Sequence, residues 1–325
     1  MPDSILDFER AVGELNEQIE RLRTLSREQD IDHSVEIAEL EQRMRDAIQS
    51  RYSQLSPWDK TQVARIAQRP YTLNYIRLIT DEFVELHGDR AFADDGAMLG
   101  GVARIDDRWL VIVGQQKGRD LPERQRRNFG SARPEGYRKA LRLMRLAEKF
   151  NRPILCLVDT PAADCSIGAE ERGISAAIAQ NMRDMFLIRV PIIVAIIGEG
   201  GSGGAIGIGV GDRVLMLEHA VYSVIPPEGC AAIIWRDPAR APEAAEALRL
   251  TAEDARGFGV VDEIVPEPLG GAHRDYDGAA RALKEAVLRH LAAVEALSPP
   301  ERLEQRYRHF RCLGQFAEAA QNASA

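Results

Sequence analysis

The hydrophobic positions of the first fifty residues recur at helical spacing. One stretch has apolar residues separated alternately by three and four positions: Ile5, Phe8, Val12, Leu15, Ile19 and Leu22. After a polar turn at residues 26–32 comes a second stretch, with Val35, Ile37, Leu40, Met44 and Ile48. A period near 3.5 residues places such side chains on one helix face, so two helices are predicted. We expect residues 1–52 to form a hairpin packed on the body or on another subunit; the alternative, a free-standing coiled coil, has few heptads.

The pattern changes after Arg69 and Pro70, where short β-branched runs alternate with amphipathic helical stretches. The predicted strands are residues 109–113, 154–158, 192–197 and 213–217, and the predicted helices are residues 135–150 and 170–185. Strand, loop and helix in repeated order indicate an α/β domain with mostly parallel strands over residues 53–325. Residues 276–307 are predicted to be helical, with a break at Pro299 and Pro300.

Composition narrows the class of protein. The chain has 325 residues, of which 45% are hydrophobic and 28% charged, as in a folded protein. Its net charge of -8 does not favour nucleic acid or an acidic membrane as a partner. Residues 190–197 are too short an apolar run to span a bilayer, and the start does not resemble a signal peptide. Four cysteines without a C-x-x-C pair favour neither a zinc module nor a disulfide framework, so a reducing cytoplasm is expected.

The most informative stretch is residues 198–204, Gly-Glu-Gly-Gly-Ser-Gly-Gly, which we call the glycine segment. It follows a predicted buried strand and precedes a short helix predicted at residues 205–210. Glycines let a ligand approach the backbone, and amides at a helix start favour negative charge. The segment is therefore predicted to stabilise an oxyanion, with these candidate residues: Gly200, Gly201, Gly203 and Gly204.

Two other interpretations of the glycine segment remain open from the residues themselves. Glycines are also needed where a strand and a helix cross tightly, although five in seven residues exceed what such packing usually needs. Gly198, Gly200 and Gly203 also satisfy G-x-G-x-x-G, and Glu218 lies about where a ribose-binding acid would lie. Against dinucleotide binding, the predicted helix is short and itself rich in glycine.

A second loop, residues 159–171, also lies between a predicted buried strand and a helix. Its exposed amides make the following residues candidates for binding an anionic group of a ligand: Ala162, Ala163, Cys165, Ser166 and Ile167. Cys165 at a helix start could also be a nucleophile. No histidine lies nearby in the sequence, however, and the adjacent Asp164 opposes a thiolate, which favours an ordinary loop cysteine.

A basic run follows the predicted strand at residues 109–113. Its candidates for binding a phosphate-rich substrate or an acidic carrier domain are Lys117, Arg119, Arg126 and Arg127. Solvated helix charge explains the run equally well. The six histidines show no metal-ligand spacing, and no side-chain acid–base pair can be identified. Two amide-rich loops without such a pair suit chemistry in which the protein stabilises oxyanions and the ligand supplies the base.

With these motifs the sequence resembles the alpha-subunit family of the bacterial acetyl-CoA carboxylase carboxyltransferase. The resemblance runs from Leu6-Asp7-Phe8-Glu9 to residues 270–274 and includes Gln116-Lys117-Gly118-Arg119, residues 126–130, residues 134–144, the glycine segment and residues 227–231. It implies a crotonase-like fold, a spiral of strand–strand–helix units. It also implies an α2β2 assembly with a zinc-bearing beta subunit, and no metal on this chain.

The resemblance further implies the reaction and its partners. A carboxyl group passes from carboxybiotin, held on a separate biotin carboxyl carrier protein, to acetyl-CoA or a related acyl-CoA, which gives malonyl-CoA for fatty acid biosynthesis. Biotin carboxylation itself takes place on another chain. Backbone amides stabilise the oxyanions, with Gly203 and Gly204 expected on the biotin side and the amides near Ser166 and Ile167 as the second choice.

One stretch departs from the family's pattern. After Asp-Thr-Pro the family usually has Gly-Ala-Tyr-Pro-Gly, and this chain has Ala162-Ala163-Asp164-Cys165-Ser166. Gln115 also stands where the family commonly has histidine. The sequence therefore suggests a divergent copy: either a carboxyltransferase with altered acyl preference or inhibitor response, or a catalytically inactive homologue that serves as an assembly partner.

Overall fold

The computed structural model describes residues 9–29 and 31–314, and within them a sheet of eight strands forms the centre. The order is β1-β2-β3-β4-β5-β6-β8, and β7 pairs with the end of β5. The first three strands are antiparallel and the others parallel. The strands are β1 (Glu82–Glu85), β2 (Met98–Ile105), β3 (Arg108–Gln115), β4 (Ile154–Thr160), β5 (Ile192–Gly201), β6 (Arg213–Leu217), β7 (Val221–Ser223) and β8 (Glu263–Val265).

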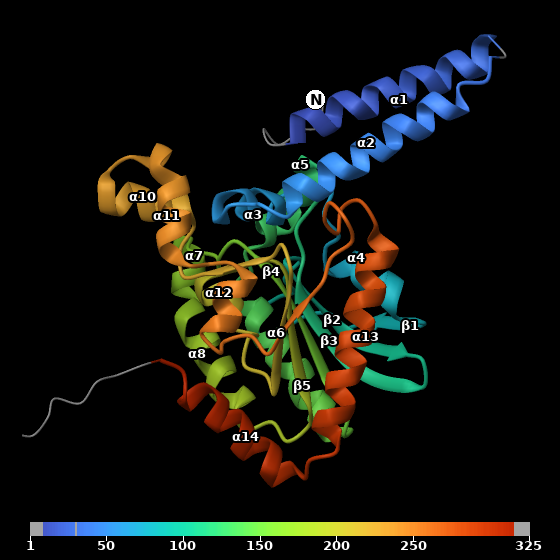
Figure 1. Ribbon diagram of the computed structural model, residues 1–325. Helices are drawn as coiled ribbons and strands as arrows, with labels where there is room; N and C mark the ends of the chain where they lie inside the picture. Colours follow the sequence, from blue (N-terminus) through green and yellow to red (C-terminus); the bar gives the residue numbers. More distant parts are fainter. Residues whose placement is uncertain (1–8, 30, 315–325) are drawn as a thin grey trace, which may run out of the picture.

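Helices surround this sheet (Figure 1). They are α1 (Arg10–Gln29), α2 (Ser34–Tyr52), α3 (Pro57–Ala64), α4 (Thr72–Ile79), α5 (Leu121–Arg126), α6 (Pro134–Lys149), α7 (Ile167–Glu171), α8 (Ile174–Met185), α9 (Ser202–Ile206), α10 (Pro227–Trp235), α11 (Ala241–Leu248), α12 (Ala252–Gly257), α13 (Tyr276–Glu295) and α14 (Pro299–Arg311). Two 3₁₀ turns lie at Asn128–Gly130 and Pro238–Arg240. None of the described helices is long and apolar enough to cross a membrane.

The predicted strands and most predicted helices are confirmed. Every residue of β4 is buried, which explains its continuous apolar run, because a central parallel strand is covered on both faces. The single helix predicted at residues 170–185 is wrong: Gly173, with φ of 78°, separates α7 from α8. A left-handed glycine ends one helix and lets the next begin in a new direction.

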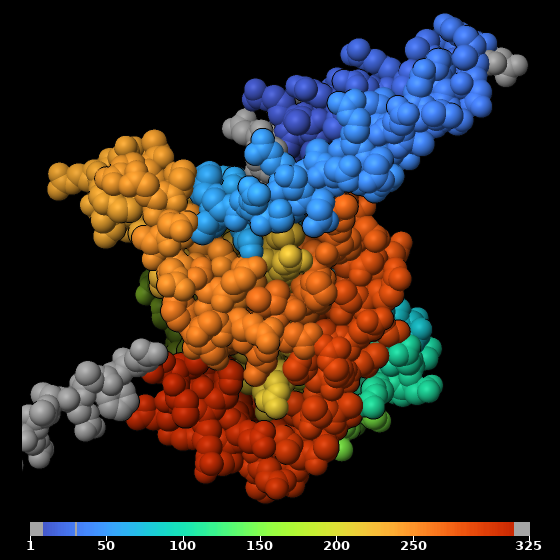
Figure 2. All heavy atoms as spheres, viewed as in Figure 1, coloured from blue at the N-terminus to red at the C-terminus, as the bar shows by residue number. Residues whose placement is uncertain are grey.

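The predicted N-terminal hairpin is formed by α1 and α2, which stand out from the body (Figures 1 and 2). Its first helix continues to Gln29, so the turn is shorter than predicted; Ile5 and Phe8 lie outside the described residues. Val12, Ile48 and Tyr52 pack with Val63 of α3 at the base of the hairpin.

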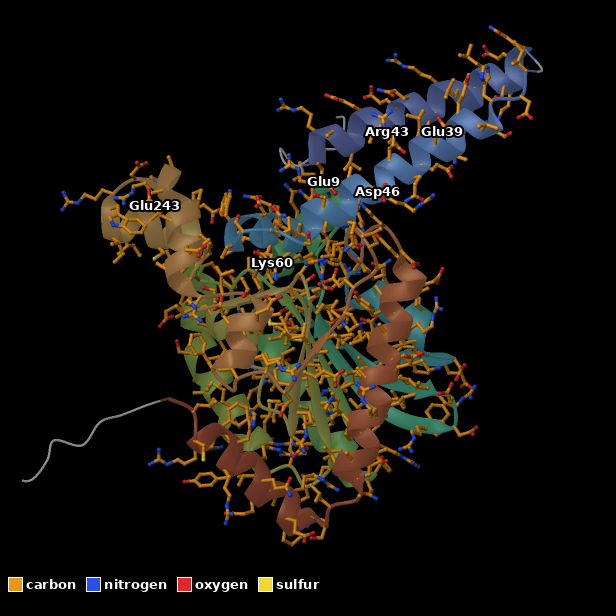
Figure 3. All side chains as sticks on the ribbon, viewed as in Figure 1. Glu9, Glu39, Arg43, Asp46, Lys60 and Glu243 are labelled. Atoms are coloured by element: carbon orange, nitrogen blue, oxygen red, sulfur yellow. The ribbon has the colours of Figure 1, made fainter. Side chains whose placement is uncertain are left out.

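Ion pairing adds to this contact with the body. Glu9 accepts hydrogen bonds from Tyr52 (2.8 Å) and Arg274 (2.6 Å), which joins both ends of the hairpin to the loop before α13. Figure 3 shows Glu9 and Asp46 near the base of the hairpin, whereas Arg43 and Glu39 lie farther out along α2. The hairpin is therefore anchored at its base, and the division of the chain at residue 52 stays a prediction.

The C-terminal helix α14 is held to the body by two buried guanidinium groups, of which Arg302 donates to the carbonyls of Arg189, Val294 and Leu297. Arg306 donates to both carboxylate oxygens of Asp212 (2.9 and 2.8 Å) and to the carbonyls of Met185 and Ile188. Asp212 in turn accepts the N–H of Ile192 (2.7 Å), the first residue of β5. This network fixes the start of the strand whose other end carries the glycine segment.

Replacing Arg306 with methionine should destabilise the protein strongly. The substitution leaves the Asp212 carboxylate buried without its partner, which costs on the order of 3–5 kcal/mol. As a control, Arg308→Met removes an exposed pair with Glu304 on the same helix and should change stability by less than about 0.5 kcal/mol. Urea denaturation followed by circular dichroism measures both; equal effects would contradict the structural assignment.

Candidate active site

The candidate site lies at the carboxyl ends of two neighbouring parallel strands, β4 and β5. Gly200 pairs with Thr160, so the glycine segment and the loop after β4 are adjacent. Residues 198–201 extend β5, and α9 begins at Ser202. The helix predicted at residues 205–210 is wrong in both bounds: it starts three residues earlier and already ends at Ile206. It starts early because Ser202 takes a left-handed conformation (φ 49°) that turns the chain at once. Such strain in a non-glycine residue costs about 1–3 kcal/mol and is concentrated at functional sites.

Close packing accounts for most glycines of the glycine segment, although the sequence pattern predicts that packing alone does not need five glycines in seven residues. A Cβ at Gly201 would lie 1.9 Å from the carbonyl oxygen of Pro161, and one at Gly204 would lie 2.6 Å from the carbonyl carbon of Ala162. At Gly200 it would meet the ring of Tyr222 at 2.7 Å. The two loops are thus in backbone contact, and a side chain at these positions would separate them.

Gly203 is different from the other glycines. A Cβ there would meet only Ile178, at an ordinary contact distance of 3.5 Å. Gly203 lines a surface hollow together with Ser202, Ile206, Tyr222, Ser223 and Val224. The first amides of a helix have no partner within that helix, so the N–H groups of Gly203 and Gly204 in the first turn of α9 are suited to an anionic oxygen.

In the second loop, two of the backbone N–H groups predicted to face a ligand donate instead to side chains of the loop itself. The N–H of Ser166 donates to the carboxylate of Asp164 (2.9 Å), and the N–H of Ala162 donates to the Thr160 hydroxyl (3.3 Å). Asp164 also lies 3.5 Å from the guanidinium of Arg133. Ile167, which is 80% exposed, begins the short helix α7. The candidates Ala163 and Cys165 lie beside these residues, and Cys165 is exposed.

Beneath the two loops lies a group of paired charges. The ammonium of Lys117 is 2.8 Å from both Asp159 and Glu199, and Arg65 pairs with Glu199 (2.9 Å) and with Glu228 (2.6 Å). Burial opposes the charge on Lys117, but the two carboxylates outweigh it and raise its pKa. Burial likewise opposes the charge on Glu199, and Lys117 and Arg65 outweigh it and lower the pKa of that carboxyl.

The four basic candidates therefore occupy different surroundings. Lys117 is held by Asp159 and Glu199, and only 12% of its side chain is exposed. Arg119 donates to the Ala67 carbonyl and to Asn74 (2.7 Å), and it stacks on the ring of Tyr71. Arg127 donates to Glu123 and to the Gly96 carbonyl. Of the four, Arg126 is the most open to a ligand, with 70% of its side chain exposed.

Sequence reasoning missed Asp159 and Glu199. The Asp159 carboxylate accepts the N–H of Glu199 (3.0 Å) as well as Lys117, so it links the end of β4 to the glycine segment. The available signal was the position of both acids directly after buried apolar runs. Across the described ranges, no group of three or more His, Cys, Asp or Glu side chains is arranged to hold a metal ion.

Comparisons of the sequence with known proteins identify its family. A profile of the family described as acetyl co-enzyme A carboxylase carboxyltransferase-like matches residues 5–314. The acetyl-coenzyme A carboxylase carboxyl transferase subunit alpha of Thermosynechococcus vestitus is 54% identical, with 97% of each chain covered. That of Halorhodospira halophila is 51% identical, with 97% of this chain and 99% of its own covered.

The chain belongs to the acetyl-CoA carboxylase carboxyltransferase alpha-subunit family. This membership, with the five-residue helix α9, decides against the dinucleotide interpretation. Glu218, the candidate ribose-binding acid, instead accepts the N–H of Glu267 (3.1 Å).

Solved structures support the fold of this alpha-subunit family member. A Pseudomonas malonate decarboxylase hetero-tetramer in complex with coenzyme A aligns with a TM-score of 0.57 at 16% identity, over 72% of this chain and 91% of that chain. Transcarboxylase 12S aligns with a TM-score of 0.54 at 20% identity, over 81% of this chain and 47% of that chain. At this level of identity the similarity is one of fold, and it confirms the crotonase-like α/β architecture.

Two alanine substitutions compare a tightly packed glycine of the glycine segment with one that faces open space. Gly204→Ala should destabilise the protein by about 1–3 kcal/mol, because the methyl group meets the backbone of the second loop. Gly203→Ala should change stability by no more than about 0.5 kcal/mol, since its methyl group makes only an ordinary contact. Urea denaturation of the two variants measures this difference, and the reverse order would show that the loops are not packed as described.

Proposed function

We propose that this chain is the alpha subunit of a biotin-dependent carboxyltransferase that transfers a carboxyl group from carboxybiotin on a carrier protein to acetyl-CoA, giving malonyl-CoA. The observation that carries the proposal is the match to the alpha-subunit family over 97% of both chains, with the glycine segment intact. A crotonase-like fold with two backbone loops at the carboxyl ends of β4 and β5 supports it.

In this proposal the chain itself binds and orients the biotin group. The first-turn amides of Gly203 and Gly204 would donate to the ureido oxygen of biotin, where negative charge develops. The open side of Gly203 fits this group, since the backbone fills the corresponding space at Gly201 and Gly204. The carboxylated biotin itself supplies the carboxyl group and a base, so this chain needs no side-chain acid or base.

The second loop is proposed to form the other side of the cofactor site. Of its candidate amides, those of Ala163, Cys165 and Ile167 are better placed to serve than that of Ser166, which donates to Asp164. Arg126 is the most accessible of the proposed carrier-binding residues. The remaining three, Lys117, Arg119 and Arg127, would act mainly by shaping the loops through their internal contacts.

A partner subunit is part of the proposal, because apolar side chains are exposed both in the hollow and on α10. Ile206, Val224, Ile233 and Ile234 are 37%, 74%, 71% and 64% exposed. The last two lie on α10, which with α11 projects from the body (Figure 1). Such exposed apolar surface is typical of an interface. We propose that a zinc-bearing beta subunit covers it and holds the acyl-CoA, in an α2β2 assembly.

The altered loop is the observation that favours a second candidate, an inactive or specialised copy. Asp164 brings a carboxylate into the loop and occupies the Ser166 amide. Turnover by the wild-type protein with its beta subunit would exclude the inactive form, and comparison of several acyl-CoA acceptors would identify a specialised one.

The test is carboxyl transfer from malonyl-CoA to biocytin by the full chain reconstituted with its beta subunit, measured as release of acetyl-CoA. We expect turnover from the complex and none from either subunit alone. Gly203→Ala should lower kcat by at least about tenfold, because its methyl group crowds the amide donors.

The matched control is Gly257→Ala on α12, where an added methyl group meets nothing within 4 Å. Its kcat should equal that of the wild type. Full activity of Gly203→Ala would refute the assignment of Gly203 to the biotin site, and an inactive wild-type complex would refute the proposed function.

A further inference from the structure

A single buried primary amide touches both loops of the candidate site. Gln115 is the last residue of β3 and is fully buried. Its Nε2 donates to the carbonyl of Gly204 (2.9 Å), and its Oε1 accepts the N–H of Asp159 (3.2 Å). One side chain thereby joins the first turn of α9 to the carboxyl end of β4.

The Gly204 carbonyl needs such a donor. Carbonyls in the last turn of a helix have no partner within it, and α9 has only five residues. The hydroxyl of Tyr137 donates to the same oxygen (3.1 Å), and burial raises the pKa of Tyr137, so this hydroxyl remains a donor. Two donors on one carbonyl fix the orientation of the peptide between Gly204 and Ala205. The N–H of Gly204 belongs to the adjoining peptide, so holding this carbonyl limits the rotation of the Gly204 backbone that carries the N–H.

The second hydrogen bond of the Gln115 amide is to the backbone N–H of Asp159. Its carboxylate already binds the ammonium of Lys117 and the N–H of Glu199. Because Gln115 fixes the backbone of Asp159 and the carbonyl of Gly204 together, it sets the distance between the two loops. A primary amide does this without a charge, and both of its bonds persist at any pH at which the protein is folded.

We propose that Gln115 is a positioning residue that sets the spacing and direction of the oxyanion-binding amides by bridging Gly204 and Asp159. This inference rests on the proposed carboxyl transfer for its catalytic consequence. Its structural consequence, a bridge between two named backbone groups, can be measured without turnover.

The principal variant is Gln115→His, assayed with the beta subunit between about pH 5.5 and about pH 8.5. A neutral imidazole offers one donor and one acceptor and can replace the amide, but an imidazolium offers only donors and loses the Asp159 N–H. We expect kcat within about threefold of wild type where the imidazole is neutral, and at least tenfold below wild type where it is protonated. Burial at this position lowers the pKa of an imidazole, so the neutral form dominates at the alkaline end of the range. A kcat more than tenfold below wild type at about pH 8.5, where the neutral imidazole can replace the amide, would overturn the proposal.

Two further variants apply even if Gln115→His does not fold. Gln115→Met removes both hydrogen bonds at similar volume, whereas Tyr137→Phe removes only the second donor to Gly204. Gln115→Met should lower kcat about 10- to 100-fold with KM for malonyl-CoA within about twofold, since misplaced groups slow the chemical step. Tyr137→Phe should have the smaller effect, and equal losses would overturn the proposal.

Amide hydrogen exchange separates this inference from the proposed function. In Gln115→Met the amide of Asp159 should exchange faster than in wild type, and in Tyr137→Phe it should be unchanged. Unchanged exchange at Asp159 in Gln115→Met would overturn the bridge whether or not the complex is active. An inactive wild-type complex with the expected exchange pattern would refute the carboxyl transfer alone.

Discussion

The site depends on the direct contact of two stretches of backbone. The chain at Gly201 and Gly204 approaches residues 160–163 so closely that a Cβ at either glycine would overlap main-chain atoms. Main-chain atoms cannot move aside as the end of a long side chain can, so glycine is required at both positions. This contact places two sets of amides, from loops after different strands, within one small region.

Charge pairing then holds the contact together. Asp159 and Glu199 lie near the carboxyl ends of the neighbouring strands β4 and β5, and the ammonium of Lys117 contacts both carboxylates. Removing one partner from such a buried group leaves an uncompensated charge, which typically costs about 3–5 kcal/mol. The pairing therefore resists separation of β4 from β5 at the end where the loops begin, while the Asp212–Arg306 pair fixes the opposite end of β5.

The sequence predicts the local elements well because their periodicity is local. The strands and the hairpin each follow from a few consecutive residues, and parallel strands place their carboxyl-end loops together. The surroundings of Lys117 could not be predicted in this way, because its partners are far away in the sequence and are brought close by the sheet. The packing of Gly201 and Gly204 could not be predicted for the same reason, because it depends on residues 160–163, which are distant in the sequence. The sequence pattern therefore indicated a ligand-binding loop. Gly203 differs, because packing does not require a glycine there and its open side is left for the proposed ligand.

The paired charges also bear on how an oxyanion can be stabilised here. Asp159 and Glu199 belong to the two strands that carry the loops, and unpaired carboxylates there would repel developing negative charge by an amount that grows as water is excluded. Lys117 and Arg65 pair with these carboxylates and offset that repulsion. Amides do not titrate, and the groups that orient them, Gln115 and Tyr137, are neutral. The site thus gains its polarity from backbone geometry, which is suited to a reaction whose proton acceptor arrives with the ligand.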